Sequence, residues 1–244
     1  MSARRTLATA RRVLAQLRHD PRTVALLLLV PCLLITLLRY VFDGQPATFD
    51  RIGAPVLVMF PFTVMFLVTS IATLRERSSG TLERLFTMPT AKLDLIAGYA
   101  LAFGLLAVVQ GVLAVALTLG PLGLDVRGGA AWVVTVAVGT GLLGMALGLF
   151  LSAFAATEFQ AVQFLPVVVL PQVLLCGLLV PREQMVGWLE AVSQALPLSY
   201  AVDAMTRVTT GSLSTAFAAD LAVVGGSAVV ALALGALTLR RRTA

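Results

Sequence analysis

Six apolar stretches dominate the sequence, and none of them carries a charged residue near its middle. About 20 helical residues cross the hydrocarbon core of a bilayer, which is about 30 Å thick, and each stretch has roughly that length. Only 12% of the 244 residues are charged, about half the proportion found in soluble proteins. We therefore predict an all-α integral membrane protein whose residues 1–244 form one membrane domain. The six predicted spans are residues 23–41, 55–74, 93–119, 130–154, 158–180 and 219–239.

The basic residues are distributed unevenly among the segments that flank these spans. Thirteen of the 18 lysines and arginines lie in the N-terminal tail, in the connection 75–92 and in the C-terminal tail. Connections rich in Lys and Arg remain cytoplasmic, so both termini and this connection are predicted to lie in the cytoplasm. The net charge of +6 is then an orientation signal, and we expect no nucleic-acid partner. Heavy use of Ala, Leu and Arg with one lysine is typical of a GC-rich bacterium, so we expect a multi-pass protein of a bacterial plasma (inner) membrane.

Residues 1–22 carry an amphipathic pattern ahead of the first predicted span. Apolar side chains recur at helical spacing between arginines, which predicts a helix that lies on the cytoplasmic leaflet in contact with membrane lipid. Such a helix could simply anchor the first span, or it could help to seat a cytoplasmic partner. The apolar positions are Leu7, Ala10, Val13, Leu14 and Leu17.

Several kinds of catalytic chemistry are excluded by the residue types in these 244 positions. Lys92 is the only lysine and follows Ala91, so no G-x-x-x-x-G-K-[ST] phosphate loop exists. The single histidine, His19, cannot build a His-rich zinc site or a Ser/His/Asp triad within the spans. We therefore predict no enzyme activity, cofactor or metal site in this chain, and we expect ATP and Mg to be held by a partner.

Glycines cluster in the fourth predicted span. Residues 139–144 match G-x-G-x-x-G as letters, but they lie within an apolar span and follow no strand, which the dinucleotide fingerprint requires. In lipid, small residues let helix backbones approach closely. We interpret Gly139, Gly141, Gly144 and Gly148 as packing residues.

Ionisable residues stay at the ends of the spans, which gives no support for ion-coupled transport. The polar side chains inside them are neutral, and Gln110 and Gln163 could face a polar substrate or, as we favour, bond a neighbouring helix. Aromatic side chains could line a path for a flat apolar compound, although they also pack in any membrane helix. Pro61, Pro166 and Pro171 permit kinks. The candidate substrate-path residues are Phe60, Phe66, Gln110, Gln163 and Phe164.

The connection 75–90 has the pattern of a short helix. Gly80 can cap its N-terminus with Glu83 three positions later, and Pro89 ends the segment. Apolar side chains at Leu82, Leu85 and Phe86 then share one face. Such a helix is suited to dock into a groove on another protein, although it could also lie on the lipid surface.

Two parts of the sequence resemble the type-2 ATP-binding-cassette (ABC) transporter permeases, in particular the drug-resistance efflux branch that includes daunorubicin-resistance-like permeases. The first part is Glu76–Leu85 with Pro89 and Gly98, which is similar to the family pattern E-R-x-x-G-T-[LI]-E-x-L…P. The second part runs through the C-terminal half, where Val186 and Gly187 stand before Trp188 in place of a proline that is common in relatives. Its matching stretches are residues 163–166, 171–177, 180–185, 188–189 and 196–204.

The resemblance implies a permease that pairs with itself or a related permease and is driven by separate P-loop ATPase subunits. It would export a hydrophobic or amphiphilic compound, such as a drug, an antibiotic or a lipid. A polysaccharide or glycolipid exporter, a membrane enzyme and a structural membrane subunit are the alternatives. The resemblance makes the connection 75–90 a coupling helix that contacts the ATPase, through Glu76, Arg77, Gly80, Thr81, Leu82, Glu83, Arg84, Leu85, Phe86 and Pro89.

The segment 181–211, between the fifth and sixth predicted spans, is long for a connection. Pro181 suits a first helical position, and Met185, Leu189, Val192 and Leu196 follow at helical spacing before Pro197 interrupts. An amphipathic helix is therefore expected on the outer side of the membrane. The resemblance implies that this segment closes the exit of the substrate path, although it could only anchor the fifth span. The implied gate residues are Pro181, Met185, Trp188, Leu189, Pro197 and Tyr200.

Overall fold

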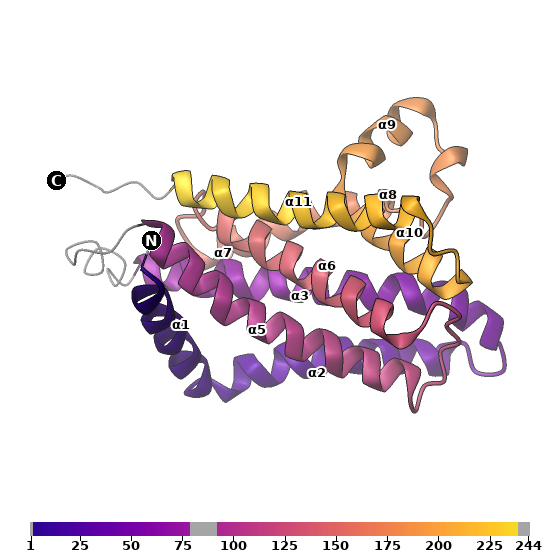
Figure 1. Ribbon diagram of the computed structural model, residues 1–244, viewed down its shortest axis with the longest axis horizontal. Helices are drawn as coiled ribbons and strands as arrows, with labels where there is room; N and C mark the ends of the chain where they lie inside the picture. Colours follow the sequence, from indigo (N-terminus) through magenta and orange to yellow (C-terminus); the bar gives the residue numbers. More distant parts are fainter. Residues whose placement is uncertain (1, 79–91, 239–244) are drawn as a thin grey trace.

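The computed structural model describes residues 2–78 and 92–238. Within these residues every regular element is helical, and six helical segments are long and apolar enough to cross a membrane. They lie side by side, with both described ends of the chain, the end of α3 and the start of α5 at the same end of the bundle (Figure 1). The predicted number of spans is therefore confirmed. The spans are α2 (Pro21–Val41), α3 (Pro46–Ser78), α5 (Lys92–Leu119), α6 (Ala130–Leu151), the irregular run Glu158–Leu175 and α11 (Thr215–Thr238).

The second span is longer than the predicted 55–74, because α3 begins at Pro46 and continues to Ser78. Its added first turns are held by the protein: Phe49 is 1% exposed and Ala54 is also buried. The connection before it therefore shrinks to a short turn in which Gly44 takes a left-handed φ of 77°. A hydropathy pattern marks the apolar part of a helix and misses polar turns that packing stabilises.

The fifth span is broken, and its predicted end at Val180 is wrong. It consists of α7 (Glu158–Phe164), a π-helical turn η1 (Leu165–Val169) and α8 (Leu170–Leu175). The prolines at 166 and 171 remove two backbone donors, and the N–H of Leu170 instead bonds the carbonyl of Leu165 five residues back. The chain then leaves the helix, with Gly177 at a φ of 92°.

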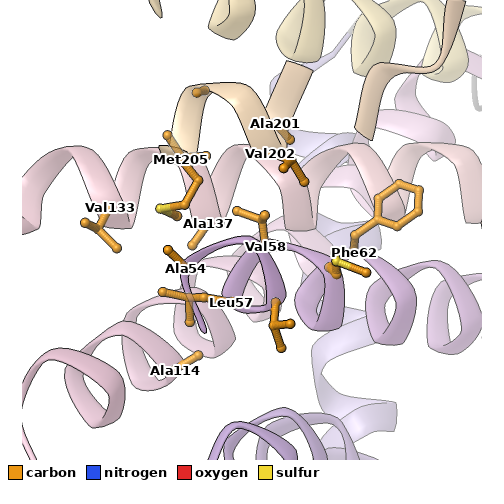
Figure 2. Close-up of a cluster of buried hydrophobic side chains, with 14 of the residues drawn as sticks. Ala54, Leu57, Val58, Phe62, Ala114, Val133, Ala137, Ala201, Val202 and Met205 are labelled. Atoms are coloured by element: carbon orange, nitrogen blue, oxygen red, sulfur yellow. The ribbon is translucent and has the colours of Figure 1, made fainter. Parts of the chain in front are cut away.

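The centre of the bundle is the contact between α3 and α6. Side chains from these two helices meet others from α5 and from α10 (Pro197–Thr210) in one apolar cluster (Figure 2). The helices approach closely because α6 presents glycines there: a Cβ on Gly144 would lie 2.2 Å from the carbonyl oxygen of Phe62, and one on Gly148 would lie 2.4 Å from that of Phe66. The predicted packing role is confirmed for these two glycines. It is wrong for Gly139, which has nothing within 4 Å of its Cβ position.

The N-terminal segment forms α1 (Ala3–Arg18), as its amphipathic pattern predicts. Its apolar face, however, is turned towards protein, because Ala10, Val13 and Leu17 are buried in a cluster with α5 side chains. At the crossing, a Cβ on Gly98 would lie 2.5 Å from the Cβ of Thr9. The expectation that this face rests on lipid is therefore wrong for the buried positions, while Leu7 remains 57% exposed.

Candidate functional site

A half-buried ion pair joins three helices at the described end of α3. Arg12 of α1 donates from Nη1 and Nη2 to the two carboxylate oxygens of Glu76 on α3, at 3.0 and 2.9 Å. The same guanidinium donates to the hydroxyl of Tyr99 on α5 at 3.1 Å, and that hydroxyl donates to Glu76. The Glu76 side chain is only 12% exposed, so these charge-assisted bonds hold α1, α3 and α5 together. We call Arg12, Glu76 and Tyr99 the helix-end clamp.

Further polar contacts hold the same end of α3. Arg75 makes a bidentate pair with Glu158 at the start of α7, at 2.8 and 3.0 Å. Both side chains are more than half exposed, so this pair contributes little to stability. Arg77 donates to the carbonyl oxygen of Ser152 at 3.1 Å. The last turns of α3 are thus connected to α1, to α5 and to the region between α6 and α7.

The predicted ATPase-coupling residues fall into two groups. Glu76 and Arg77 lie at the described end of α3, and both bond other parts of this chain. The sequence around Glu76 and Arg77 could have indicated a helix end. It did not indicate that Glu76 bonds Arg12 of α1 or that Arg77 bonds Ser152 after α6. The remaining eight, from Gly80 to Pro89, lie outside the described residues, and their coupling role stays a prediction.

The segment 181–211 folds into three short helices, with boundaries that differ from the prediction. Pro181 has extended backbone and precedes a 3-10 turn at Arg182–Gln184, so the amphipathic helix α9 begins only at Gly187 and ends at Ala195. Pro197 does more than interrupt that helix, because it is the first residue of α10, where its missing N–H costs nothing. We call residues 181–211 the cap.

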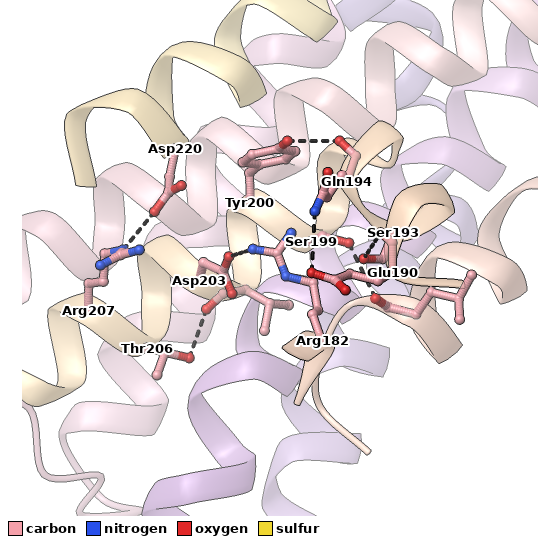
Figure 3. Close-up of polar contacts among 12 residues, drawn as sticks. Arg182, Glu190, Ser193, Gln194, Ser199, Tyr200, Asp203, Thr206, Arg207 and Asp220 are labelled. Carbon is pink, nitrogen blue, oxygen red and sulfur yellow. Dashed lines mark hydrogen bonds and ion pairs between the residues drawn. The ribbon is translucent and has the colours of Figure 1, made fainter. Parts of the chain in front are cut away.

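The predicted gate residues differ in exposure and in their contacts. Trp188 is 67% exposed, whereas Met185 and Leu189 are half-buried. Tyr200, on α10, donates its hydroxyl to the carbonyl oxygen of Gln194 at 2.8 Å and thereby joins α9 to α10 (Figure 3). Tyr200 thus has a structural contact, and the gate function of the set stays a prediction.

A set of charges that the sequence analysis did not single out joins parts of the cap to one another and to α11. Arg182 pairs with Asp203 on α10 and lies over the ring of Tyr200, 5.5 Å from its centre. Arg207, one turn later, pairs through Nε with Asp220 of α11 at 2.9 Å (Figure 3). Burial is the largest influence on Asp203 and raises its pKa, with Arg182 and Arg207 acting in the opposite direction and Asp220 and Glu183 adding to the rise. We call the two ion pairs Arg182–Asp203 and Arg207–Asp220 the cap network.

The candidate substrate-path residues differ in burial. Phe66 is fully buried in the core and Gln163 is exposed, while Phe60 and Phe164 pack partly against the core. Buried and exposed side chains are thus mixed among the five, and their role in a path stays a prediction.

Gln110 has the helix-to-helix bond that we favoured. It is 1% exposed and donates from Nε2 to the carbonyl oxygen of Leu27 on α2 at 2.9 Å. That carbonyl lacks its helical partner because the residue four positions later is Pro31, which has no N–H. The glutamine of one span thus satisfies the backbone group that a proline leaves unpaired in another.

The fold defines a helical multi-pass membrane protein whose polar residues tie helix ends together. Comparison with known proteins then gives the family: the sequence model described as ABC-2 type transporter matches residues 4–209. The chain belongs to this family, which identifies it as a transport component.

Curated relatives agree with this assignment. "ABC transporter G family member 20" of Dictyostelium discoideum is 26% identical over 169 residues, which cover 69% of this chain and 23% of that protein. "Probable multidrug ABC transporter permease YbhR" of Escherichia coli is 27% identical over 155 residues, 63% of this chain and 42% of that protein. "Inner membrane transport permease YhhJ" of the same species is 27% identical over 177 residues, 68% of this chain and 44% of that protein. The chain thus spans less than half the length of these relatives.

Proposed function

We propose that the chain is the permease of an ABC exporter in a bacterial plasma membrane, with both termini in the cytoplasm. It moves a hydrophobic or amphiphilic compound outward, as the drug-resistance efflux branch would, and separate ATPase subunits that bind ATP and Mg supply the energy. The spans offer few polar side chains, which favours a drug or a lipid as the compound. A second permease copy, identical or related, completes the pathway.

The observation that carries this proposal is the helix-end clamp beside residues 79–91. α3 and α5 flank this segment, and Arg12, Glu76 and Tyr99 lock their ends to α1. An ATPase that displaces the segment therefore moves three helices together. The close approach of α3 and α6 at Gly144 and Gly148 passes the displacement to α6, since closely packed helices move as rigid bodies.

The displacement reaches the opposite end of the bundle through α10. This helix contributes Ala201 and Met205 to the central cluster with α3 and α6, and the cap network connects it to Arg182 and to α11. A tilt of α3 and α6 would therefore move the cap, which supports a role for the cap as the external gate. No covalent chemistry is required of this chain.

The coupling step is tested with the double variant E83Q/F86A, made in the chain co-expressed with its ATPase subunits. Loss of the docking side chains should abolish compound-stimulated ATP hydrolysis while the protein still reaches the membrane. Thr87→Ala, in the same segment, is the matched control and should retain stimulation. Normal stimulation in E83Q/F86A would remove the coupling assignment.

The orientation is tested separately, so that a failed coupling assay can be interpreted. A cysteine placed at Thr87 should react with an impermeant maleimide only from the cytoplasmic side, and one placed at Ser212 only from the outside. The native Cys32 and Cys176, which are half-buried and buried, are replaced by serine in the parent. Labelling of Thr87→Cys from outside would reverse the proposed direction of coupling.

A further inference from the structure

A groove of about 520 Å³ lies between α1, α2, α3 and α5, at the end of the bundle that adjoins residues 79–91. Its volume falls within the range of about 300–1,000 Å³ that is usual for ligand sites. The walls are mostly apolar and include Val30 from α2 and Val64 and Val68 from α3. Leu26, another wall residue, is 63% exposed, so the groove opens on the outside of the bundle, where α2 faces lipid. None of the predicted substrate-path residues lines it.

The acidic groups at the polar end of the groove already have partners. Glu76 pairs with Arg12 in the helix-end clamp. Asp20 caps α2 by accepting hydrogen bonds from the backbone N–H and the hydroxyl of Thr23, at 3.2 and 2.6 Å. These bonds lower the pKa of Asp20, and Arg75 and Arg22 lower it further by their charge. The carboxylate is therefore compensated by a helix N-terminus and by nearby cations.

Two exposed arginines adjoin the lining of the same end in the sequence, because Arg18 follows Leu17 and Arg22 precedes Thr23. Arg18, in the last turn of α1, and Arg22, in the first turn of α2, are exposed and make no ion pair within the described part of the chain. No acidic residue occurs in α1, Ala3–Arg18. Asp20, whose pKa the charge of Arg22 helps to lower, is the one carboxylate between the two arginines in the sequence, so the positive charge is in excess there. An apolar groove open to lipid, with an excess of exposed arginines next to its polar lining residues, is complementary to alkyl chains attached to an anionic head.

We propose that this groove binds an anionic phospholipid of the adjoining leaflet. An acyl chain lies along the wall formed by Val30, Val64 and Val68, and the phosphate lies at Arg18 and Arg22. The lipid thereby bridges α1 and α2 to α3, next to Glu76 of the helix-end clamp. This site concerns a resident lipid and is independent of the compound that the protein transports.

The experiment measures retained lipid by native mass spectrometry of the purified full chain, after incubation with equal amounts of phosphatidylglycerol and phosphatidylcholine. The unaltered protein should retain phosphatidylglycerol in preference. Removing two arginines in R18Q/R22Q should lower the affinity for phosphatidylglycerol about 25-fold, because each basic residue near an anionic surface raises the affinity about fivefold. The control R4Q/R5Q removes the same charge from exposed positions of α1 about 20 Å away and should retain the lipid.

The apolar wall is tested independently with Val68→Trp, which fills the groove, against Val230→Trp at a position of α11 that is 58% exposed. Val68→Trp should lose phosphatidylglycerol, and Val230→Trp should keep it. Equal retention of both lipids by the unaltered protein would overturn the proposal, as would full retention by R18Q/R22Q, a readout that holds even if Val68→Trp fails to fold. A Val68→Trp protein that keeps the lipid but loses its dimeric state would assign the groove to a second copy of the chain instead. The measurement needs no ATPase, so its result stands apart from the proposed transport function.

Discussion

Replacing Gly144 with alanine should force α6 away from α3. The added Cβ would lie 2.2 Å from the carbonyl oxygen of Phe62, whereas ordinary contacts begin at 3.4 Å. The backbones must therefore separate by about 1.2 Å, since a carbonyl within a helix cannot rotate aside as a side chain can. Overpacking of this kind costs about 1–3 kcal/mol. For a domain of this size, each kcal/mol corresponds to about 2–4 °C, so the unfolding temperature should fall by about 2–12 °C.

The assay is thermal unfolding of the purified protein in detergent, followed by fluorescence and by loss of the monodisperse elution peak. Gly139→Ala is the matched control, because it makes the same chemical change in the same helix at a position with nothing within 4 Å. Alanine favours the helix over glycine by about 0.5–1 kcal/mol, so this variant should unfold at the same temperature as the parent or a few degrees higher.

The double variant G144A/G148A makes the prediction sharper. One displacement of α6 relieves both clashes, because Gly148 meets Phe66 of α3 in the same way that Gly144 meets Phe62. Its loss of stability should therefore be smaller than the sum of the two single losses. The reasoning is refuted if Gly144→Ala unfolds within 1 °C of Gly139→Ala, a difference on the order of the scatter expected for surface substitutions.

Two further predictions concern the buried Gln110 and the half-buried Asp203. Gln110→Leu should destabilise the protein by about 1–2 kcal/mol, because the carbonyl of Leu27 loses its donor. Adding Pro31→Ala should recover most of this loss of stability, because alanine supplies the missing backbone N–H. No recovery in the double variant would contradict the pairing of Gln110 with Leu27. Asp203 has a pKa raised by burial, so its contribution to stability is present at low pH and is lost as the pH rises through that raised value. The unfolding temperature of the parent should therefore rise relative to Asp203→Asn as the pH is lowered from 7 towards the ordinary carboxyl range, and a relative fall would show that the bond to Arg182 outweighs burial.

Hydropathy and charge predicted the spans because a bilayer imposes length and polarity on every crossing helix. The same physics explains the error in α3, whose turns from Pro46 to Ala54 are held by tertiary packing of Phe49. Pro166 and Pro171 indicated an irregular fifth span, but a proline alone does not predict whether a helix kinks, widens into a π turn or ends. In the structure the π turn comes at the first proline, and the helix ends after the second.

The polar contacts of the candidate site were beyond a single sequence for a different reason. Glu76 and Tyr99 lie 64 and 87 positions from Arg12 along the chain, and only the fold brings the three together. Gly98 belongs to the stretch of sequence that resembles the family. Its physical role is to let α1 cross α5 closely at Thr9. This role depends on the packing of α1 against protein, whereas the sequence had predicted that α1 lies on lipid.

The distribution of regular and irregular backbone indicates where this protein can change shape. α1, α3, α5 and α6 are joined by the helix-end clamp and by contacts too close to admit a Cβ, so we expect a displacement arriving at their ends to be carried without bending. The run from η1 to α9 contains a π turn, a left-handed Gly177 and extended residues around Pro181. Backbone of that kind has fewer hydrogen bonds to break. We therefore expect the difference between two transport states to be absorbed in this run, between the rigid helices and α10, which Arg182 contacts through Asp203.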